Sequence, residues 1–162
     1  MPKSRLDLLV SLVEPCTLAV DIGTDHGYLA LKLLQQGIAQ RVIATDLRPL
    51  PLKQAQKTFA QANVFDGITF VVSDGLLAVD EQPDTAILAG MGGDLIIKIL
   101  TQSLDRFQRM HQIVIQPNSH LEKVRQFAFQ YGFSITQEHI TFDGFYYISL
   151  TLTYTAQPVF AD

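Results

Sequence analysis

The chain has 162 residues, of which 48% are hydrophobic and 17% are charged, and its formal net charge at pH 7 is -4. This composition excludes a disordered polypeptide and predicts one globular domain that is large enough to bury a core. No apolar run reaches the roughly 18–20 residues that are needed to cross a bilayer. An acidic chain has no general attraction for nucleic acid, so RNA binding would need a local basic patch.

Few residues indicate the cellular compartment of the protein or a metal-binding site. Cys16 is the single cysteine, which excludes an internal disulfide framework and is typical of a reducing cytoplasm. The first residues do not resemble a secretory signal, because Arg5 and Asp7 interrupt the apolar stretch there. The four histidines lack the spacing of metal ligands, so we expect a cytoplasmic protein with no metal site and no membrane segment.

Short β-rich runs alternate with helical patterns along the chain. Ser4-Arg5-Leu6-Asp7 is a capping-box pattern that predicts a helix over 4–14. Strands are expected at 17–22, 41–45, 68–72, 85–89 and 113–115, and helices at 25–36, 50–62, 94–100 and 119–131. Ser119-His120-Leu121-Glu122 is a second capping-box pattern, at the start of the last helix. A hairpin with strands at about 133–141 and 145–154, around Asp143-Gly144, closes the chain.

This order of elements predicts an α/β fold in a single domain over residues 1–162, with an N-terminal helix at 1–14 and a Rossmann-like core at 15–162. Alternating strands and helices favour a doubly wound, mostly parallel sheet that binds its ligand at the carboxyl ends of the strands. The closing antiparallel β-hairpin is more typical of class I methyltransferases than of dehydrogenases.

The loop DIGTDHG (residues 21–27) follows the first strand and looks like a nucleotide-cofactor loop in which Asp25 replaces the central glycine. A carboxylate at that place would repel the pyrophosphate of a dinucleotide. S-adenosylmethionine has no phosphate and carries a sulfonium and an ammonium, so the pattern Asp21-x-Gly23-x-Asp25-x-Gly27 favours that cofactor over NAD. The structural alternatives are that Asp21 caps the following helix and that Asp25 is an acid in its first turn.

Acidic residues also follow the second and third strands. Asp46, next to Leu47, could accept hydrogen bonds from both ribose hydroxyls. Asp74, next to Gly75, could accept one from an adenine amino group. These spacings suit an adenosine ligand, although each acid could instead be a turn residue.

Five segments, in this order and spacing, resemble one known family: DIGTDHGYL, ATDLRPLPLKQA, SDGL, ILAGMGGDLI and IQPN. They are similar to the bacterial tRNA (adenine(22)-N(1))-methyltransferases (TrmK-like), and the resemblance covers essentially the whole chain. It implies a class I methyltransferase that uses S-adenosylmethionine to methylate N1 of one adenine in the tRNA core. Family members usually continue into a helical coiled-coil domain that helps to hold tRNA, whereas this sequence stops at Asp162. We therefore expect ordinary cofactor binding and a weaker grip on tRNA.

The motifs predict three overlapping groups of site residues. The cofactor residues are Asp21, Gly23, Asp25, Gly27, Asp46, Leu47, Asp74, Gly75, Gly90 and Met91. The substrate residues are His26, Tyr28, Met91, Gly92, Gly93, Gln116, Pro117 and Asn118, and the catalytic candidates are Asp25, His26 and Asn118. Equally open are a locally satisfied His26 and a turn role for Asn118. At residues 90–93 we expect close approach of the backbone to a flat ligand, and the alternative is a tight turn before a helix.

Neutral adenine N1 already carries a lone pair, so catalysis would consist mainly of positioning, without a strong base. Asp25 or Asp94 could stabilise the cationic product. Five basic residues could contact RNA phosphates or could be ordinary solvated positions: Arg5, Arg48, Lys53, Lys57 and Lys98. Three alternatives remain: a methyltransferase with another substrate, a non-catalytic cofactor-binding module, and an oxidoreductase, which the loop carboxylate disfavours.

Overall fold

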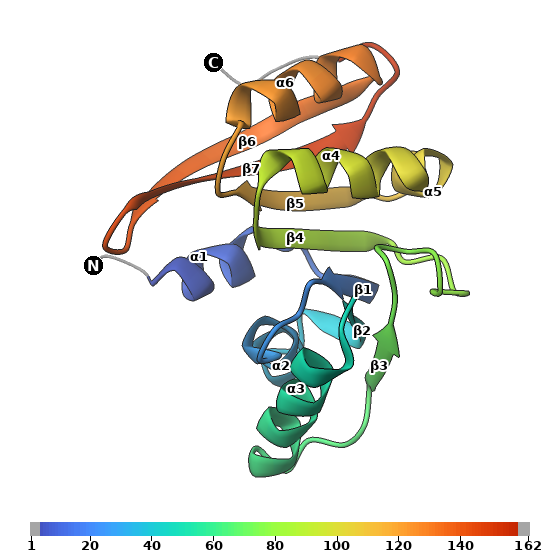
Figure 1. Cartoon of the computed structure of the whole chain (residues 1–162), viewed down its shortest axis with the longest axis vertical. Helices are drawn as coiled ribbons and strands as arrows, with labels where there is room; N and C mark the ends of the chain where they lie inside the picture. Colours follow the sequence, from blue (N-terminus) through green and yellow to red (C-terminus); the bar gives the residue numbers. More distant parts are fainter. Residues whose placement is uncertain (1–3, 159–162) are drawn as a thin grey trace.

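The computed structural model describes residues 4–158, so the two ends of the predicted domain, 1–3 and 159–162, lie outside the described residues. The elements are, in chain order, α1 (Arg5–Leu12), β1 (Cys16–Ile22), α2 (Tyr28–Gln35), β2 (Ala39–Asp46), α3 (Pro49–Gln61), β3 (Ile68–Val72), β4 (Thr85–Met91), α4 (Gly93–Gln102), α5 (Leu104–Gln108), β5 (Gln112–Pro117), α6 (Leu121–Gln130), β6 (Phe133–Phe142) and β7 (Tyr146–Tyr154). The strands form one seven-stranded sheet in the order β3-β2-β1-β4-β5-β7-β6 (Figure 1).

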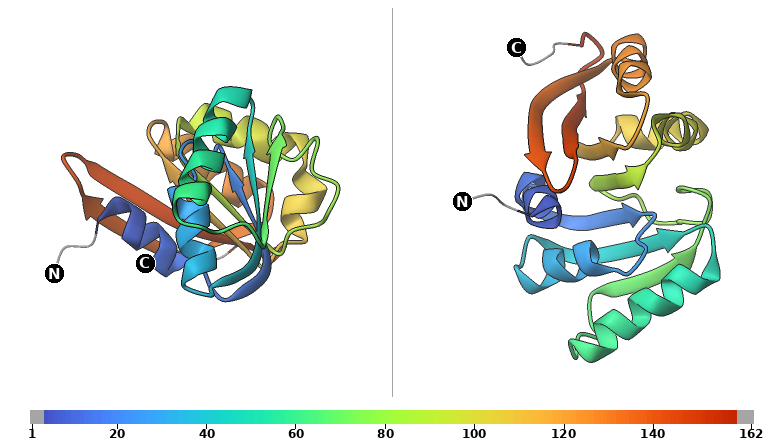
Figure 2. Two further views of the ribbon diagram at one scale, coloured as in Figure 1. Left: turned by 90° about the horizontal axis from the view of Figure 1, so that it is seen from below. Right: turned by 60° about the vertical axis from the view of Figure 1, so that its left-hand side comes forward.

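Strands β1 to β5 pair in parallel, and β7 is antiparallel to both β5 and β6. Helices cover both faces of the sheet (Figure 2). Leu18, Val20 and Ile22 of β1 pack on one face with side chains of α4 and α6, whereas Ala19 packs on the other face with α1 and α2. Burial on both faces explains why the middle of each central strand is an apolar run. The predicted doubly wound sheet with a closing antiparallel hairpin is confirmed.

Helix α2 begins at Tyr28, three residues after the expected start at 25. Asp25 and Gly27 have φ angles of 55° and 78°, and this left-handed backbone cannot continue as a right-handed helix. Gly27 is the N-cap residue of α2. Both structural alternatives for the loop are therefore wrong, because Asp21 does not cap the helix and Asp25 lies before its first turn.

The two predicted capping boxes differ in outcome. Ser4 is the N-cap residue of α1, and its side chain accepts a hydrogen bond from the backbone N–H of Asp7 at 3.1 Å. Ser119 does not cap α6, because the N-cap residue is His120, which has a φ angle of 54° and makes no side-chain capping bond. Helix α5 was not predicted, since its five residues are too few to show helical periodicity.

Gly92 and Gly93 are explained by packing between two loops. The N–H of Gly93 donates to the carbonyl of Ser119 at 2.9 Å, and a Cβ on Gly93 would lie 2.5 Å from that oxygen and 2.8 Å from the carbonyl oxygen of His120. A Cβ on Gly92 would lie 2.9 Å from Oγ of Ser119. These glycines let the start of α4 approach the loop after β5, a packing role that the sequence did not predict.

Replacing Gly93 by alanine should therefore destabilise the protein. The added methyl group meets backbone atoms that cannot rotate away, so the free energy of unfolding should fall by about 1–3 kcal/mol. Urea denaturation measures the change. Gly92→Ala is the matched control, because its methyl group meets only the rotatable Ser119 hydroxyl and should cost less. Equal stability of Gly93→Ala and the unmodified chain would contradict this packing.

Candidate active site

A cavity of about 820 Å³ opens at the carboxyl ends of the parallel strands. Parallel strands end at one edge of the sheet, so the residues that follow them converge there. Loops after β1 to β5 line the cavity, together with α1 and the tip of the β6–β7 hairpin. The sequence-predicted residues that line it are Asp21, Gly23, Asp25, His26, Tyr28, Asp46, Leu47, Asp74, Gly75, Gly90, Met91 and Asn118.

Asp21 is the buried acid of the cavity, with 4% of its surface exposed. Its carboxylate accepts a hydrogen bond from the hydroxyl of Thr24 at 2.8 Å. Burial raises the pKa of Asp21 to about 6, the bond from Thr24 opposes this rise, and the charge of Asp46 adds to it. At neutral pH Asp21 is therefore ionised although it is desolvated, which suits it to face a cationic group or a strong donor.

The loop carboxylate of Asp25 lies on the open side of the cavity. Its Oδ1 is 3.8 Å from Nε2 of His26, and the two side chains are 72% and 52% exposed. The ring of His26 is also 6.0 Å from that of Tyr28, measured between centroids. Asp25, His26 and Tyr28 thus form an exposed polar and aromatic rim, able to meet a ligand that enters from solvent.

Two glycines of the site make room for side chains. A Cβ on Gly23 would lie 2.9 Å from Cε of Met91, so the missing side chain lets Met91 reach the loop after β1. A Cβ on Gly90 would lie 3.2 Å from Nη2 of Arg5, and the φ angle of Gly90 is 74°. The end of β4 therefore lies close to the loop after β1 and to the start of α1, through contacts that only glycine permits without a shift.

Asp46 and Asp74 keep free acceptor atoms. Oδ1 of Asp46 accepts from the N–H of Arg48 at 3.1 Å, and Oδ2 of Asp74 accepts from the amide of Gln102 at 3.4 Å. Within residues 4–158 the other oxygen of each carboxylate has no hydrogen-bond partner. Leu47 and Leu95, which are 65% and 45% exposed, line the same cavity and supply apolar surface for a ring.

Five predicted site residues do not line the cavity: Gly27, Gly92, Gly93, Gln116 and Pro117. Gly27 packs against α3, where an added Cβ would lie 2.9 Å from Cβ of Ala55. Gln116 is fully buried, and its amide nitrogen donates to Oγ of Ser149 at 2.9 Å. Its amide oxygen accepts from Nε of Arg5, so Gln116 acts on the cavity only through that arginine.

Sequence reasoning missed the contribution of α1 and of the hairpin. Arg5 lines the cavity together with Ser4, Leu6 and Leu9 of the first helix, and Asp143 does so from the hairpin tip. The sequence marks Arg5 only as one of several basic residues, and no local pattern indicates that α1 folds over the strand ends. Of the other basic candidates, Arg48 lines the cavity, whereas Lys53, Lys57 and Lys98 are exposed residues outside it.

In the part of the chain that the structure describes, no three His, Cys, Asp or Glu side chains are grouped so that they could hold a metal ion. Nor is any helix within residues 4–158 long and apolar enough to cross a membrane.

Comparison with known proteins identifies the family. A family model described as "Methyltransferase domain" matches residues 2–150. The tRNA (adenine(22)-N(1))-methyltransferase of Bacillus subtilis is 26% identical over 137 residues, or 84% of this chain. The chain belongs to the TrmK-like family of S-adenosylmethionine-dependent methyltransferases. It spans 58% of the length of the Bacillus enzyme and 64% of that of a Mycoplasma genitalium relative.

Solved structures of the family have the same fold. TrmK of M. capricolum, in complex with S-adenosylhomocysteine, is 25% identical with a TM-score of 0.88, and the match covers 100% of this chain and 73% of that one. Sp1610 of Streptococcus pneumoniae, in complex with S-adenosylmethionine, is 28% identical with a TM-score of 0.90, over 98% and 76% of the two chains. The predicted class I methyltransferase fold is confirmed, and these relatives bind the predicted cofactor or its product.

The raised pKa of Asp21 predicts how stability depends on pH. The pKa in the folded protein, about 6, exceeds the ordinary value of 3.8, so the protonated group favours the folded state below pH 3.8 and this contribution is lost as the pH rises through 6. Asp21→Asn keeps an acceptor for Thr24 and never ionises. Between pH 3.8 and 7.5 its free energy of unfolding should therefore rise relative to that of the unmodified chain, by roughly 2–3 kcal/mol. Urea denaturation across this range measures the difference, and parallel pH curves for the two proteins would contradict the burial of an ionised Asp21.

Proposed function

We propose that the chain transfers a methyl group from S-adenosylmethionine to N1 of an adenine in tRNA. The observation that carries this proposal is the convergence of Asp21, Asp46 and Asp74 on one cavity, in a family whose structures bind this cofactor. The choice of tRNA as the substrate is supported by the tRNA methyltransferase of Bacillus subtilis.

The free oxygens of the cavity fit the cofactor. In this proposal Asp46 accepts from the ribose hydroxyls, and Asp74 accepts from the adenine amino group between the apolar side chains of Leu47 and Leu95. Gly23 lies at the methionine end in contact with Met91, and Asp21 faces the ammonium group there. Because burial raises the pKa of Asp21 to about 6, its attraction for a cation is present above that pH and is lost below it.

The residues at the ends of β4 and β5 are the candidates for holding the substrate base. Met91 lines the cavity beside Gly23, and Asn118, whose N–H donates to the carbonyl of Met91 at 2.9 Å, is exposed at the same edge. When bound, the cofactor supplies a methyl group on a positively charged sulfur. Adenine N1 already has a lone pair, so these residues need only hold the base in line, with its N1 toward that methyl group. No residue has to remove a proton, and in this proposal the carboxylate of Asp25 stabilises the cationic product from the open side of the cavity.

Incubation with labelled S-adenosylmethionine and total tRNA tests the proposal. Label should appear as 1-methyladenosine, and it should disappear when the target adenine of a transcribed tRNA is replaced by guanine. Cofactor binding without label in any tRNA would contradict the proposal and favour a different substrate or a non-catalytic binding module. A parallel titration with NAD tests the oxidoreductase alternative, for which we expect no binding.

Asp46→Ala should weaken binding of S-adenosylmethionine. The change removes a charged acceptor for two hydroxyls, and the cost should be about 1.5–3 kcal/mol of binding free energy. Isothermal titration measures it, with Asp46→Asn as the matched control, because asparagine keeps one acceptor oxygen and should lose less affinity. An unchanged dissociation constant for a folded Asp46→Ala protein would show that the ribose lies elsewhere.

A further inference from the structure

Arg5, the first residue of α1, is held in place from three sides. Its Nε donates to the amide oxygen of Gln116. Its guanidinium carbon lies 4.3 Å from the centroid of the Tyr147 ring. Nη2 lies beside Gly90, where a Cβ would be only 3.2 Å away. An arginine side chain normally loses much rotamer freedom when it binds a ligand, and a group that is already fixed in this way loses less.

The support beneath Arg5 is rigid as well. Gln116 and Ser149 are both fully buried, and the hydrogen bond of 2.9 Å between them fixes which way the amide of Gln116 points. The amide oxygen is thereby directed at Nε of Arg5. A buried amide bonded on both sides is costly to disturb, so the position of the guanidinium is set by the sheet and not by its own flexible stem.

The terminal nitrogens of Arg5 remain available. Among residues 4–158, neither Nη1 nor Nη2 has a hydrogen-bond partner, although Arg5 lines the cavity. The acids that line the same cavity are Asp21, Asp25, Asp46, Asp74 and Asp143, and none of them forms a salt bridge with Arg5. A guanidinium offers two parallel N–H groups whose geometry matches two oxygens of one phosphate or carboxylate.

The position of Arg5 separates it from the other arginine of the cavity. Arg48 follows β2, whereas Arg5 contacts Gly90 of β4 and Gln116 of β5. Strand β1 lies between β2 and β4 in the sheet, so the two arginines belong to different ends of the cavity. The end at β4 and β5 is the one that we assign to the substrate base.

An arginine at that end does not favour the methyl transfer itself. The methyl donor is a cation and the methylated adenine is a cation, so a fixed positive charge beside them repels both. The anion that an RNA substrate brings with its base is a phosphate. We propose that Arg5 binds a phosphate of the nucleotide whose adenine is methylated, with its two terminal nitrogens on two oxygens of that phosphate. The inference rests on the proposed function and adds a recognition site to it.

The alternative is that Arg5 only joins α1 to β5 through Gln116 and to the hairpin through Tyr147. Adenosine and its monophosphates distinguish the two cases, because they differ only in the phosphate. Adenosine, 5′-AMP and 3′-AMP are titrated into protein that is saturated with S-adenosylhomocysteine, and binding is followed by NMR. We expect at least one monophosphate to bind more tightly than adenosine, by about tenfold to a hundredfold, as for hydrogen bonds to a charged group.

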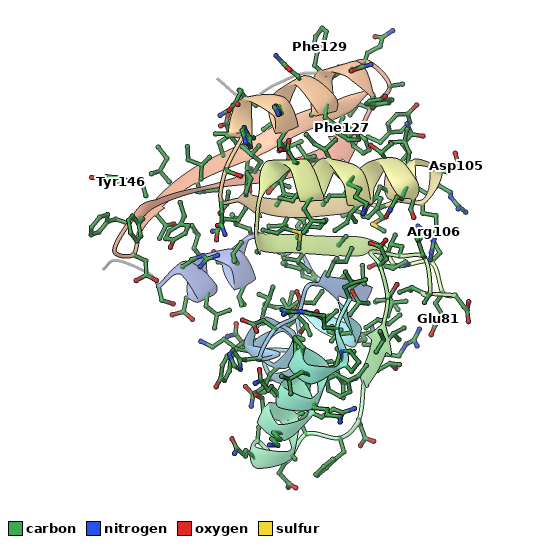
Figure 3. The ribbon with its side chains drawn as sticks, in the orientation of Figure 1. Glu81, Asp105, Arg106, Phe127, Phe129 and Tyr146 are labelled. Carbon is green, nitrogen blue, oxygen red and sulfur yellow. The ribbon has the colours of Figure 1, made fainter. Side chains whose placement is uncertain are left out.

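The variant Arg5→Gln should lose this preference while its affinity for adenosine is unchanged. Arg109→Gln is the matched control, since it removes the same charge from an exposed residue, the C-cap of α5, whose Nε donates to the carbonyl of Asp105 at 3.3 Å. Figure 3 labels Asp105 and Arg106 of this helix. Should Arg5→Gln not fold, Arg5→Lys tests the same point. Lysine keeps the charge but cannot bond Gln116 and two phosphate oxygens together, so the preference should fall. In tRNA binding, Arg5→Gln should lower the salt slope by about 0.7–0.9, the value for one phosphate contact.

The outcomes separate the two proposals. A chain that methylates tRNA but binds adenosine and both monophosphates equally would overturn the role of Arg5 alone. A preference for phosphate that survives in folded Arg5→Gln would also overturn it. A chain that binds the cofactor but methylates no RNA would contradict the proposed function, and this inference with it.

Discussion

The burial of β1 on both faces, between parallel neighbours, is the constraint on which the rest of the site depends. The register pairs Asp21 with Ala44 of β2 and with Ile87 of β4, so the strand carries its carboxylate into the sheet before the loop begins. Little of the carboxylate is exposed there, and the loss of hydration raises the pKa of the group. A carboxylate in this position is stabilised by Thr24 on one side and leaves the cavity side for a ligand.

The same geometry places a second constraint on the loop after β1. The chain must reverse its direction over the strand ends within a few residues. Gly23, Asp25 and Gly27 all have left-handed backbone, with φ angles of 73°, 55° and 78°. Aspartate is among the few residues other than glycine that tolerate this region. Asp25 can therefore occupy a place where glycine is usual, and its side chain then projects to the open side of the cavity. Aspartate in place of the central glycine, the feature that distinguishes this loop from a dinucleotide-binding loop, is thus compatible with the backbone.

Much of this arrangement could be predicted from the sequence, for identifiable reasons. The central strands are apolar because both faces are buried, and the acids that follow them lie at one edge because the strands are parallel. Gln116 was misplaced because β5 was expected to end at Ile115, whereas it continues to Pro117 and holds Gln116 inside the sheet. The predicted start of α2 was wrong because residue types alone do not specify the left-handed backbone angles of Asp25 and Gly27. The contact of Arg5 with Gln116 joins residues 111 positions apart, and no local pattern indicates such a contact.

The sheet order has a consequence for the way the chain is assembled as it leaves the ribosome. Strand β7, the last strand within residues 4–158, lies between β5 and β6 and is not at an edge of this sheet. A nascent chain that ends before Tyr146 has its cofactor loops but has no neighbour for the outer side of β5. Arg5 is made well before Tyr147 and Ser149, so the contacts that hold its guanidinium form only after the hairpin has been made. The cofactor half of the cavity can form early in synthesis, whereas the half assigned to the substrate is completed only when the hairpin has been inserted.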